Sequence, residues 1–230
     1  MRPKLLIGLI VLLLAGVGAD FAAARYFEGQ VAATLARRYR LERPIVQVRD
    51  FPFLPHLALG RLSAIDLAAS DVRARGVTAE RVEVHLHDVS VPRRVLLGEG
   101  GPITVGRADG QVELSEAEVN SLLADALKGA TMRLDRGGVQ LSVSTDLAGQ
   151  PVRATIAGTI GARNGHLLFT PTRIEGGVPV PAALATQLLS QFRLDVPLPR
   201  LPADVQVERV TSVPGALIVA GRAGTVRVAT

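Results

Sequence analysis

The feature that most constrains the fold is an alternation of apolar and polar residues along Glu80–Val91. Val82, Val84 and Leu86 fall on one side of an extended segment, and the other side carries polar groups: Arg81, Glu83, His85 and His87. Alternate side chains of a strand point to opposite faces of its sheet. One buried and one solvated face is typical of antiparallel sheets, whereas parallel sheets are covered on both faces. The segment therefore predicts an antiparallel sheet.

Most of the remaining chain also has the pattern of strands. Strand segments are expected at 46–48, 103–105, 110–114, 139–145, 152–160, 167–169, 205–210, 216–220 and 225–228, and two more are expected to carry Leu57, Leu59, Leu62, Ile65 and Leu67. Apolar residues at helical spacing predict helices at 20–40, after the N-cap Ser115, and at about Pro181–Phe192. Helices are too few to connect parallel neighbours, so we expect an α+β fold with a long antiparallel sheet.

The composition restricts the chemistry of the interior. Aromatic residues make up 3% of the chain, with no Trp, so an apolar interior must be mainly aliphatic. Such an interior suits acyl chains and is poorly equipped to stack nucleobases, so no nucleic-acid partner is expected. There is no Cys, which excludes disulfides, thiolate metal sites and a lipoprotein anchor. The formal charge of +5 permits contact with anionic lipid headgroups without requiring it.

The N-terminus predicts the compartment. Met1–Lys4 is positively charged, and Leu5–Ala19 is an uncharged apolar run that ends in small residues. This is the layout of a signal peptide, and a longer, uncleaved membrane anchor is the alternative. We expect residues 1–24 to be a signal peptide or anchor and 25–230 to be an exported domain. The expected location is the periplasm or the outer face of the cytoplasmic membrane.

No catalytic residue, metal site or cofactor site is predicted. His85 and His87 share a strand face near Glu83 and Asp88, but no third ligand is placed to complete a metal site. The sequence has no nucleophile elbow, and the glycines at 98–101 lack the Lys and Ser/Thr of a phosphate loop. Arg93 and Arg94 follow Pro92, where they could meet a phosphate headgroup or form a solvated turn.

Five short motifs follow one another along the chain. Asp50-Phe51-Pro52-Phe53-Leu54 is followed by Gly60-Arg61-Leu62, Val89-Ser90-Val91-Pro92, Val112-Glu113-Leu114-Ser115 with Asn120, and Pro197-Leu198-Pro199-Arg200-Leu201-Pro202. In this order and spacing the chain resembles the LmeA-like phospholipid-binding proteins of actinobacterial envelopes. Asp50 stands where that pattern would have Gly.

The resemblance implies a fold of the tubular lipid-binding type, in which a long curved antiparallel sheet wraps around amphipathic helices. It also implies non-enzymatic binding of a phospholipid or a lipid-linked glycan precursor, in support of lipoglycan (mannan) maturation. The expected partners are a phospholipid or glycolipid, the cytoplasmic membrane surface and a membrane glycosyltransferase.

The residues expected to contact lipid, or alternatively to form plain core, lie on three segments. They are Phe51, Phe53, Leu54 and Leu57; Val119, Leu122, Leu123 and Leu127; and Leu184, Leu188, Leu189 and Phe192. Arg93 and Arg94 are the headgroup candidates. Two other functions stay open at this point: an adaptor protein with a solid core, and a glycolipid hydrolase using His85, His87, Glu83 and Asp88.

Overall fold

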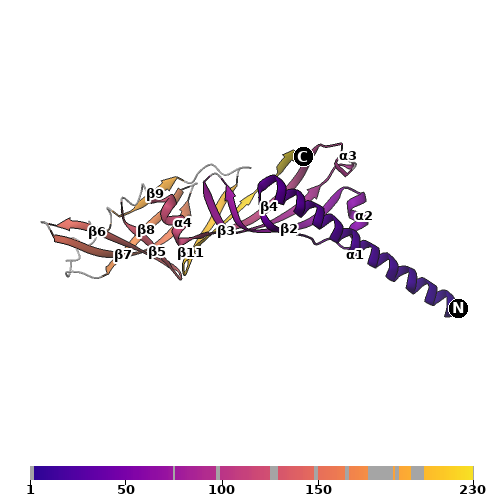
Figure 1. The fold of residues 1–230 in the computed structure, drawn as a ribbon, viewed down its shortest axis with the longest axis horizontal. Coiled ribbons are helices and arrows are strands. Elements are labelled where there is room, and N and C mark those ends of the chain that lie inside the picture. The colour runs from indigo at the N-terminus through magenta and orange to yellow at the C-terminus, as the bar shows by residue number, and fades with distance from the viewer. Residues whose placement is uncertain are drawn as a thin grey trace. The chain divides into compact units, whose positions relative to one another are not determined.

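The structure is a computed structural model of the 230-residue chain. It describes residues 3–74, 76–96, 99–124, 129–147, 150–163, 166–175, 189, 192–197 and 205–229. Strands dominate and helices are few, which confirms the predicted α+β class (Figure 1). In chain order the elements are α1 Pro3–Tyr39, β1 Glu42–Val48, α2 Phe53–Ala58, β2 Arg61–Ala74, β3 Val77–Ser90, α3 Arg93–Leu96, β4 Pro102–Ser115, α4 Glu116–Leu122, β5 Thr131–Asp135, β6 Gly138–Leu147, β7 Gln150–Arg163, β8 His166–Glu175, β9 Leu194–Pro197, β10 Gln206–Val213, β11 Ala216–Ala223 and β12 Val226–Ala229.

The strands form two sheets. The first has the order β1-β2-β3-β4-β11-β10, and β12 pairs with β4 as well. The second has the order β5-β6-β7-β8-β9. β1–β2, β4–β12, β10–β11 and every pair of the second sheet are antiparallel, as the alternating pattern predicted. The sequential order of the second sheet identifies it as a meander of hairpins.

The chain divides into two compact units. Unit 1 contains residues 1–70, 83–109 and 223–230, and unit 2 contains 71–82 and 110–222. Each unit has its own cluster of buried apolar side chains, and the two are described separately below.

In unit 1, the second half of α1 packs on the sheet. The buried cluster consists of Val46, Phe53, Leu62, Ile65, Val89, Val91 and Val105, and α1 adds Ala23, Ala24, Phe27, Val31, Ala32 and Leu35 at helical spacing. The packed segment lies within the helix expected at 20–40. Helical conformation extends back to Pro3, so that the uncharged run is part of the same helix. Where the exported part begins stays a prediction.

In unit 2, α4 packs on the β5–β8 sheet. Val119 and Leu123 of α4 join Met132, Leu134, Val139, Leu141, Ile156, Leu167, Phe169 and Leu217 in the buried cluster. Ser115 is the N-cap and accepts a hydrogen bond from the Glu118 amide at 3.2 Å, as predicted. The Glu118 carboxylate accepts a hydrogen bond from the Thr78 amide at 3.1 Å.

Some sequence predictions were wrong. Leu57 and Leu59 were expected on a strand, but Leu57 lies in α2 and Leu59 caps its C-terminus. Gly60 then turns the chain with φ of +68°, which an L side chain adopts only with strain. The segments expected at 103–105 and 110–114 are one strand, β4, and the sequence patterns missed α3, β5 and β9. Most of the helix expected at Pro181–Phe192 lies outside the described residues, as do residues 198–202 of the proline-rich link.

Candidate functional site

The residues expected to contact lipid in unit 1 are positioned by a buried carboxylate. Asp20 of α1 is 5% exposed, and its two carboxylate oxygens accept hydrogen bonds from the backbone amides of Phe53 and Leu54, each at 2.7 Å. The residue preceding α2 is Pro52, whose side chain cannot act as a cap. Asp20 therefore supplies from α1 the acceptor that the first turn of α2 lacks. Residue patterns alone did not identify this role, although an Asp at the end of an uncharged run was a signal that could have suggested it.

This arrangement separates the side chains of the Phe51–Leu54 motif. Phe53 is 1% exposed, and its ring centroid lies 5.4 Å from that of Phe27 in the core of unit 1. Phe51 is 68% exposed and Leu54 is 43% exposed. Leu59, at the end of α2, is 72% exposed. We call Phe51, Leu54 and Leu59 the apolar rim; Leu57, from the same helix, packs partly into the core.

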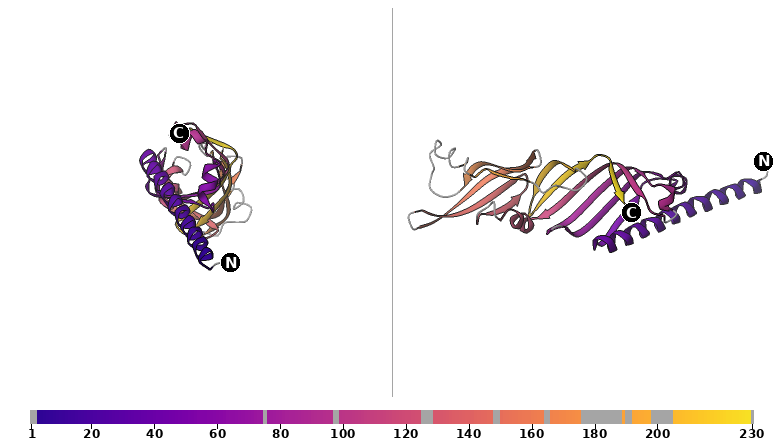
Figure 2. Two further views of the ribbon diagram at one scale, coloured as in Figure 1. Left: turned by 90° about the vertical axis from the view of Figure 1, so that its right-hand side faces the viewer. Right: turned by 90° about the horizontal axis from the view of Figure 1, so that it is seen from above.

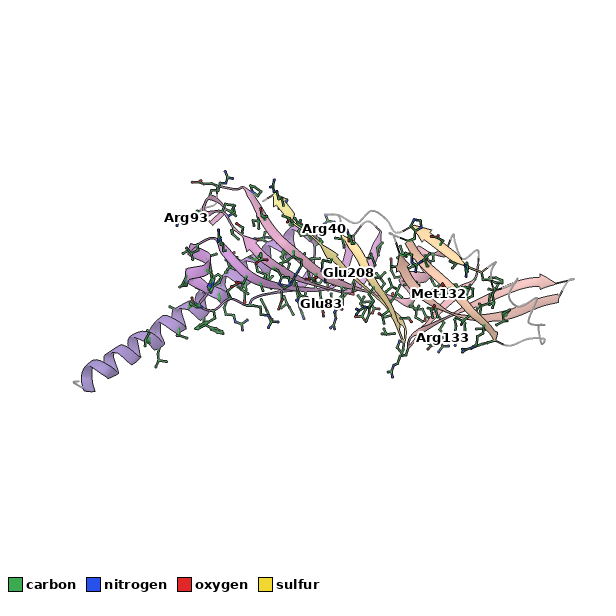
Figure 3. The ribbon with its side chains drawn as sticks, turned by 180° about the vertical axis from the view of Figure 1, so that it is seen from behind. Arg40, Glu83, Arg93, Met132, Arg133 and Glu208 are labelled. Atoms are coloured by element: carbon green, nitrogen blue, oxygen red, sulfur yellow. The ribbon has the colours of Figure 1, made fainter. Side chains whose placement is uncertain are left out.

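The headgroup candidates lie close to the end of α2. The carbonyl of Gly60 accepts a hydrogen bond from the Val91 amide at 2.8 Å, and Pro92 and α3 follow directly. A Cβ atom on Gly60 would lie 2.5 Å from the Val91 carbonyl oxygen, so this close approach requires glycine. Arg93 and Arg94 are both exposed on α3, and Figure 3 labels Arg93. Arg93 and Arg94 therefore follow closely after Val91, which contacts Gly60 at the end of α2.

The N-terminal half of α1 adds further exposed apolar groups. Leu13, Leu14, Val17 and Phe21 are all exposed, and the Arg25 guanidinium lies 5.1 Å from the centroid of the Phe21 ring. Glu28 then accepts a hydrogen bond from the Val48 amide at 2.8 Å, and this bond joins α1 to β1. Among the residues that the structure describes, no helix combines the length and apolar character needed to cross a bilayer.

Aliphatic side chains of the unit 1 sheet are only partly covered. Leu67, Leu86, Ile103, Ala108 and Val226 contact the buried cluster but remain half-buried. They come from four strands, β2, β3, β4 and β12. We call these five side chains the aliphatic face of unit 1.

The predicted lipid-contacting residues of unit 2 have mixed surroundings. Val119 and Leu123 are buried among protein side chains, whereas Leu122 is exposed. Leu189 and Phe192 are half-buried against the same cluster. Leu127, Leu184 and Leu188 lie outside the described residues. The role of all of them in lipid binding stays a prediction.

The histidines of β3 bind separate carboxylates. His85 Nδ1 lies 2.8 Å from Asp66, which also accepts a hydrogen bond from Arg49. His87 Nε2 lies 3.3 Å from Asp109. The two histidines thus do not converge with Glu83 and Asp88 on one centre. Within the described ranges, no group of His, Asp and Glu has the arrangement of a metal site.

The environment of Asp66 shifts its titration. Burial is the largest single influence and pulls the pKa of this carboxyl upward. The hydrogen bonds and positive charges of His85 and Arg49 together outweigh burial, so the pKa is lowered below the ordinary value for Asp. This side chain is 19% exposed, and the ion pair holds β2 against β3 on the polar side of the sheet.

Unit 2 contains a small surface hollow that the sequence did not predict. It has a volume of about 20 Å³ and is lined by Arg81, Gln111, Glu113 and Ile218. Typical sites for small molecules measure roughly 300–1,000 Å³ and are mainly apolar. This hollow is therefore too small to hold the acyl chains of a phospholipid.

Comparisons with known proteins agree with the order of the motifs. A family model described as LmeA-like phospholipid-binding matches residues 18–222. No curated protein matches the chain, and no solved structure does. The matched range includes Asp20, the whole apolar rim and the aliphatic face apart from Val226. Because the match covers nearly the whole chain, the protein belongs to the LmeA-like phospholipid-binding family.

Proposed function

We propose that this protein binds a phospholipid or a lipid-linked glycan precursor at the outer face of the cytoplasmic membrane, without chemical conversion, in support of lipoglycan maturation. The observation that carries the proposal is the family match over residues 18–222, because phospholipid binding is the property by which that family is described. The uncharged run Leu5–Ala19 supports a location at the membrane.

Within unit 1, the aliphatic face is the best place for acyl chains. Its five side chains are apolar, only half-buried, and continuous with the buried cluster. Transfer of an acyl chain from water contributes about 0.8 kcal/mol for each buried CH₂ group, so affinity requires no conspicuous polar site. The exposed Arg93 and Arg94 would then bind the phosphate of the headgroup by charge-assisted hydrogen bonds.

Presentation to a membrane glycosyltransferase would link lipid binding to lipoglycan synthesis. A lipid-linked glycan has a polar part that must remain accessible while its tails are covered. Exposed arginines in the same unit as the aliphatic face would allow this arrangement, because they would contact the headgroup region and leave the sugar in solvent.

Native mass spectrometry of the purified protein, after incubation with phosphatidylglycerol vesicles, tests the proposal. We expect bound lipid on the unaltered chain, and less of it on Leu67→Gln and Leu86→Gln, which place an amide within the aliphatic face. Leu86→Met keeps the surface apolar and should retain binding, and Arg133→Gln on the exposed side of β5 is the matched control. Absence of lipid from the unaltered chain, or equal lipid on Leu86→Gln and Leu86→Met at equal stability, would reject the proposal.

A further inference from the structure

Exposed apolar side chains are concentrated at one place in unit 1. Eleven large apolar side chains lie exposed in the part of the chain whose burial is described. Seven of them belong to the N-terminal half of α1 or to the apolar rim: Leu13, Leu14, Val17, Phe21, Phe51, Leu54 and Leu59. Scattered single apolar residues are normal on a protein surface, whereas a large contiguous patch marks an interaction site.

The two groups are held together by Asp20. Its carboxylate binds the amides of Phe53 and Leu54, so the rim lies beside the turn of α1 that carries Val17 and Phe21. Figures 1 and 2 show α2 alongside the middle of α1, and the N-terminal half of α1 extending beyond it. The rim is therefore at the level where the uncharged part of the helix begins, and it cannot shift along α1 without breaking the two hydrogen bonds to the buried Asp20 carboxylate.

We propose that the N-terminal half of α1 and the apolar rim form one docking surface that inserts into a phospholipid bilayer. This inference rests on the proposed function, in which the bilayer supplies the lipid. The occupant follows from continuity, because the helical segment that carries Leu13, Leu14 and Val17 belongs to the run Leu5–Ala19, fifteen residues without a charge. A helix that is apolar on all sides requires an apolar environment.

The charges around the rim fit a bilayer with anionic lipids. Arg61 follows Gly60 directly, and Arg93 and Arg94 begin α3 next to the contact between Gly60 and Val91. Arg25 lies over the Phe21 ring, one helical turn beyond it. Apolar side chains inserted at the headgroup boundary with arginines beside them are typical of interfacial binding. A docked rim would place the Arg93–Arg94 segment at the lipid headgroups.

The absence of Trp allows a direct test in the full chain. Phe51→Trp and Leu59→Trp each place a single fluorophore in the rim, and Tyr39→Trp places one at the far end of α1. Tyr39 is also exposed and lies eighteen positions after Phe21 on the same helix, a distance of about 27 Å along its axis. Each variant is bound to vesicles of equal parts phosphatidylglycerol and phosphatidylcholine, with or without bromine on the acyl chains.

The proposal predicts that brominated acyl chains quench most of the emission of Phe51→Trp and Leu59→Trp, and that this emission shifts to the blue. Tyr39→Trp should keep its emission. Unquenched rim variants on vesicle-bound protein would overturn the proposal, as would equal quenching of all three. A blue shift without quenching that grows with protein concentration would show a second copy on the rim and would also overturn it.

The same samples separate the failure of this inference from the failure of the proposed function. Lipid that remains bound to the unaltered chain after transfer to detergent is counted by native mass spectrometry. Quenching of the rim variants without retained lipid would support the docking surface and remove the lipid-carrying function. Retained lipid without quenching of the rim variants would support the lipid-carrying function and remove the docking surface.

Discussion

Asn120 is the side chain through which α4 is fixed to the edge of the second sheet, and its removal gives a sharp prediction. The side-chain nitrogen donates to the carbonyls of Glu116 at 2.9 Å and Met132 at 2.7 Å, and the side-chain oxygen accepts from the Met132 amide at 2.8 Å. Met132 is fully buried in β5, which is an edge strand. Asn120 therefore satisfies both backbone groups of Met132, as a neighbouring strand would do.

In Asn120→Ala both backbone groups of Met132 lose their partner. Leaving one buried polar group unsatisfied costs about 1–3 kcal/mol. Because this site is part-buried, water can replace some of the lost hydrogen bonding and reduce the total cost. We therefore expect the free energy of unfolding to fall by about 3 kcal/mol. Asn120→Asp keeps the acceptor, loses the donor and turns a negative charge toward two carbonyl oxygens. At neutral pH it should be destabilised at least as much, and part of the stability should return in acid as the carboxyl gains a proton that it can donate.

Urea unfolding followed by circular dichroism gives the free energies. Hydrogen exchange measured by mass spectrometry locates the change, and we expect faster exchange in residues 129–135. Ser121→Ala is the matched control, because Ser121 is exposed on the same helix. The reasoning is refuted if Asn120→Ala lowers the free energy of unfolding by less than about 0.5 kcal/mol, the usual range of a surface substitution. It is also refuted if acid does not narrow the difference between Asn120→Asp and the unaltered chain.

Three further predictions concern single contacts. Asp20→Ala removes the acceptor of one buried and one part-buried backbone amide at the start of α2 and should lower the free energy of unfolding in urea by about 2–4 kcal/mol; a cost near zero would contradict the role of this carboxylate as a cap. Gly158→Ala would place a Cβ atom 2.5 Å from the Thr170 carbonyl oxygen, so thermal unfolding should occur several degrees lower, and an unchanged melting temperature would contradict the close contact. The lowered pKa of Asp66 means that the contacts of its carboxylate with His85 and Arg49 stabilise the fold above about pH 4 and are lost as the pH falls through the folded-state pKa. The difference in unfolding free energy between the unaltered chain and Asp66→Asn, measured by urea titration, should therefore close in acid, and a constant difference would contradict this assignment.

The strands were predictable because their signal is local. The alternation at Glu80–Val91 lies within β3, Val77–Ser90, apart from the final residue, and the closing strands at 205–210, 216–220 and 225–228 correspond to β10, β11 and β12. In each case one face packs on a core, so the period of two is visible in the sequence. The order of the short motifs identified the family for the same reason, since it required no knowledge of contacts between distant residues.

The helix α2 was not predictable in the same way. Leu57 and Leu59 are spaced by two as in a strand, and Pro52 and Pro55 argue against a helix. The helix forms because Asp20, more than thirty residues earlier in the chain, accepts the hydrogen bonds of its first two amides. This contact is tertiary, and no local window of the sequence contains it. β5 was missed for a related reason, because its backbone is completed by the side chain of Asn120.

Polar contacts also decide which apolar residues of the candidate site are exposed. Composition and spacing treat Phe51, Phe53 and Leu54 alike, yet only Phe53 is buried. The separation follows from where α1 holds the chain: Asp20 fixes the start of α2, and Glu28 fixes the Val48 amide of the preceding strand. With both ends of the intervening segment fixed, one ring meets Phe27 in the core and its neighbours are left in solvent. The apolar surface that this segment exposes is thus set by two carboxylates of α1, so the spacing of hydrophobic residues does not predict which of its side chains face outward.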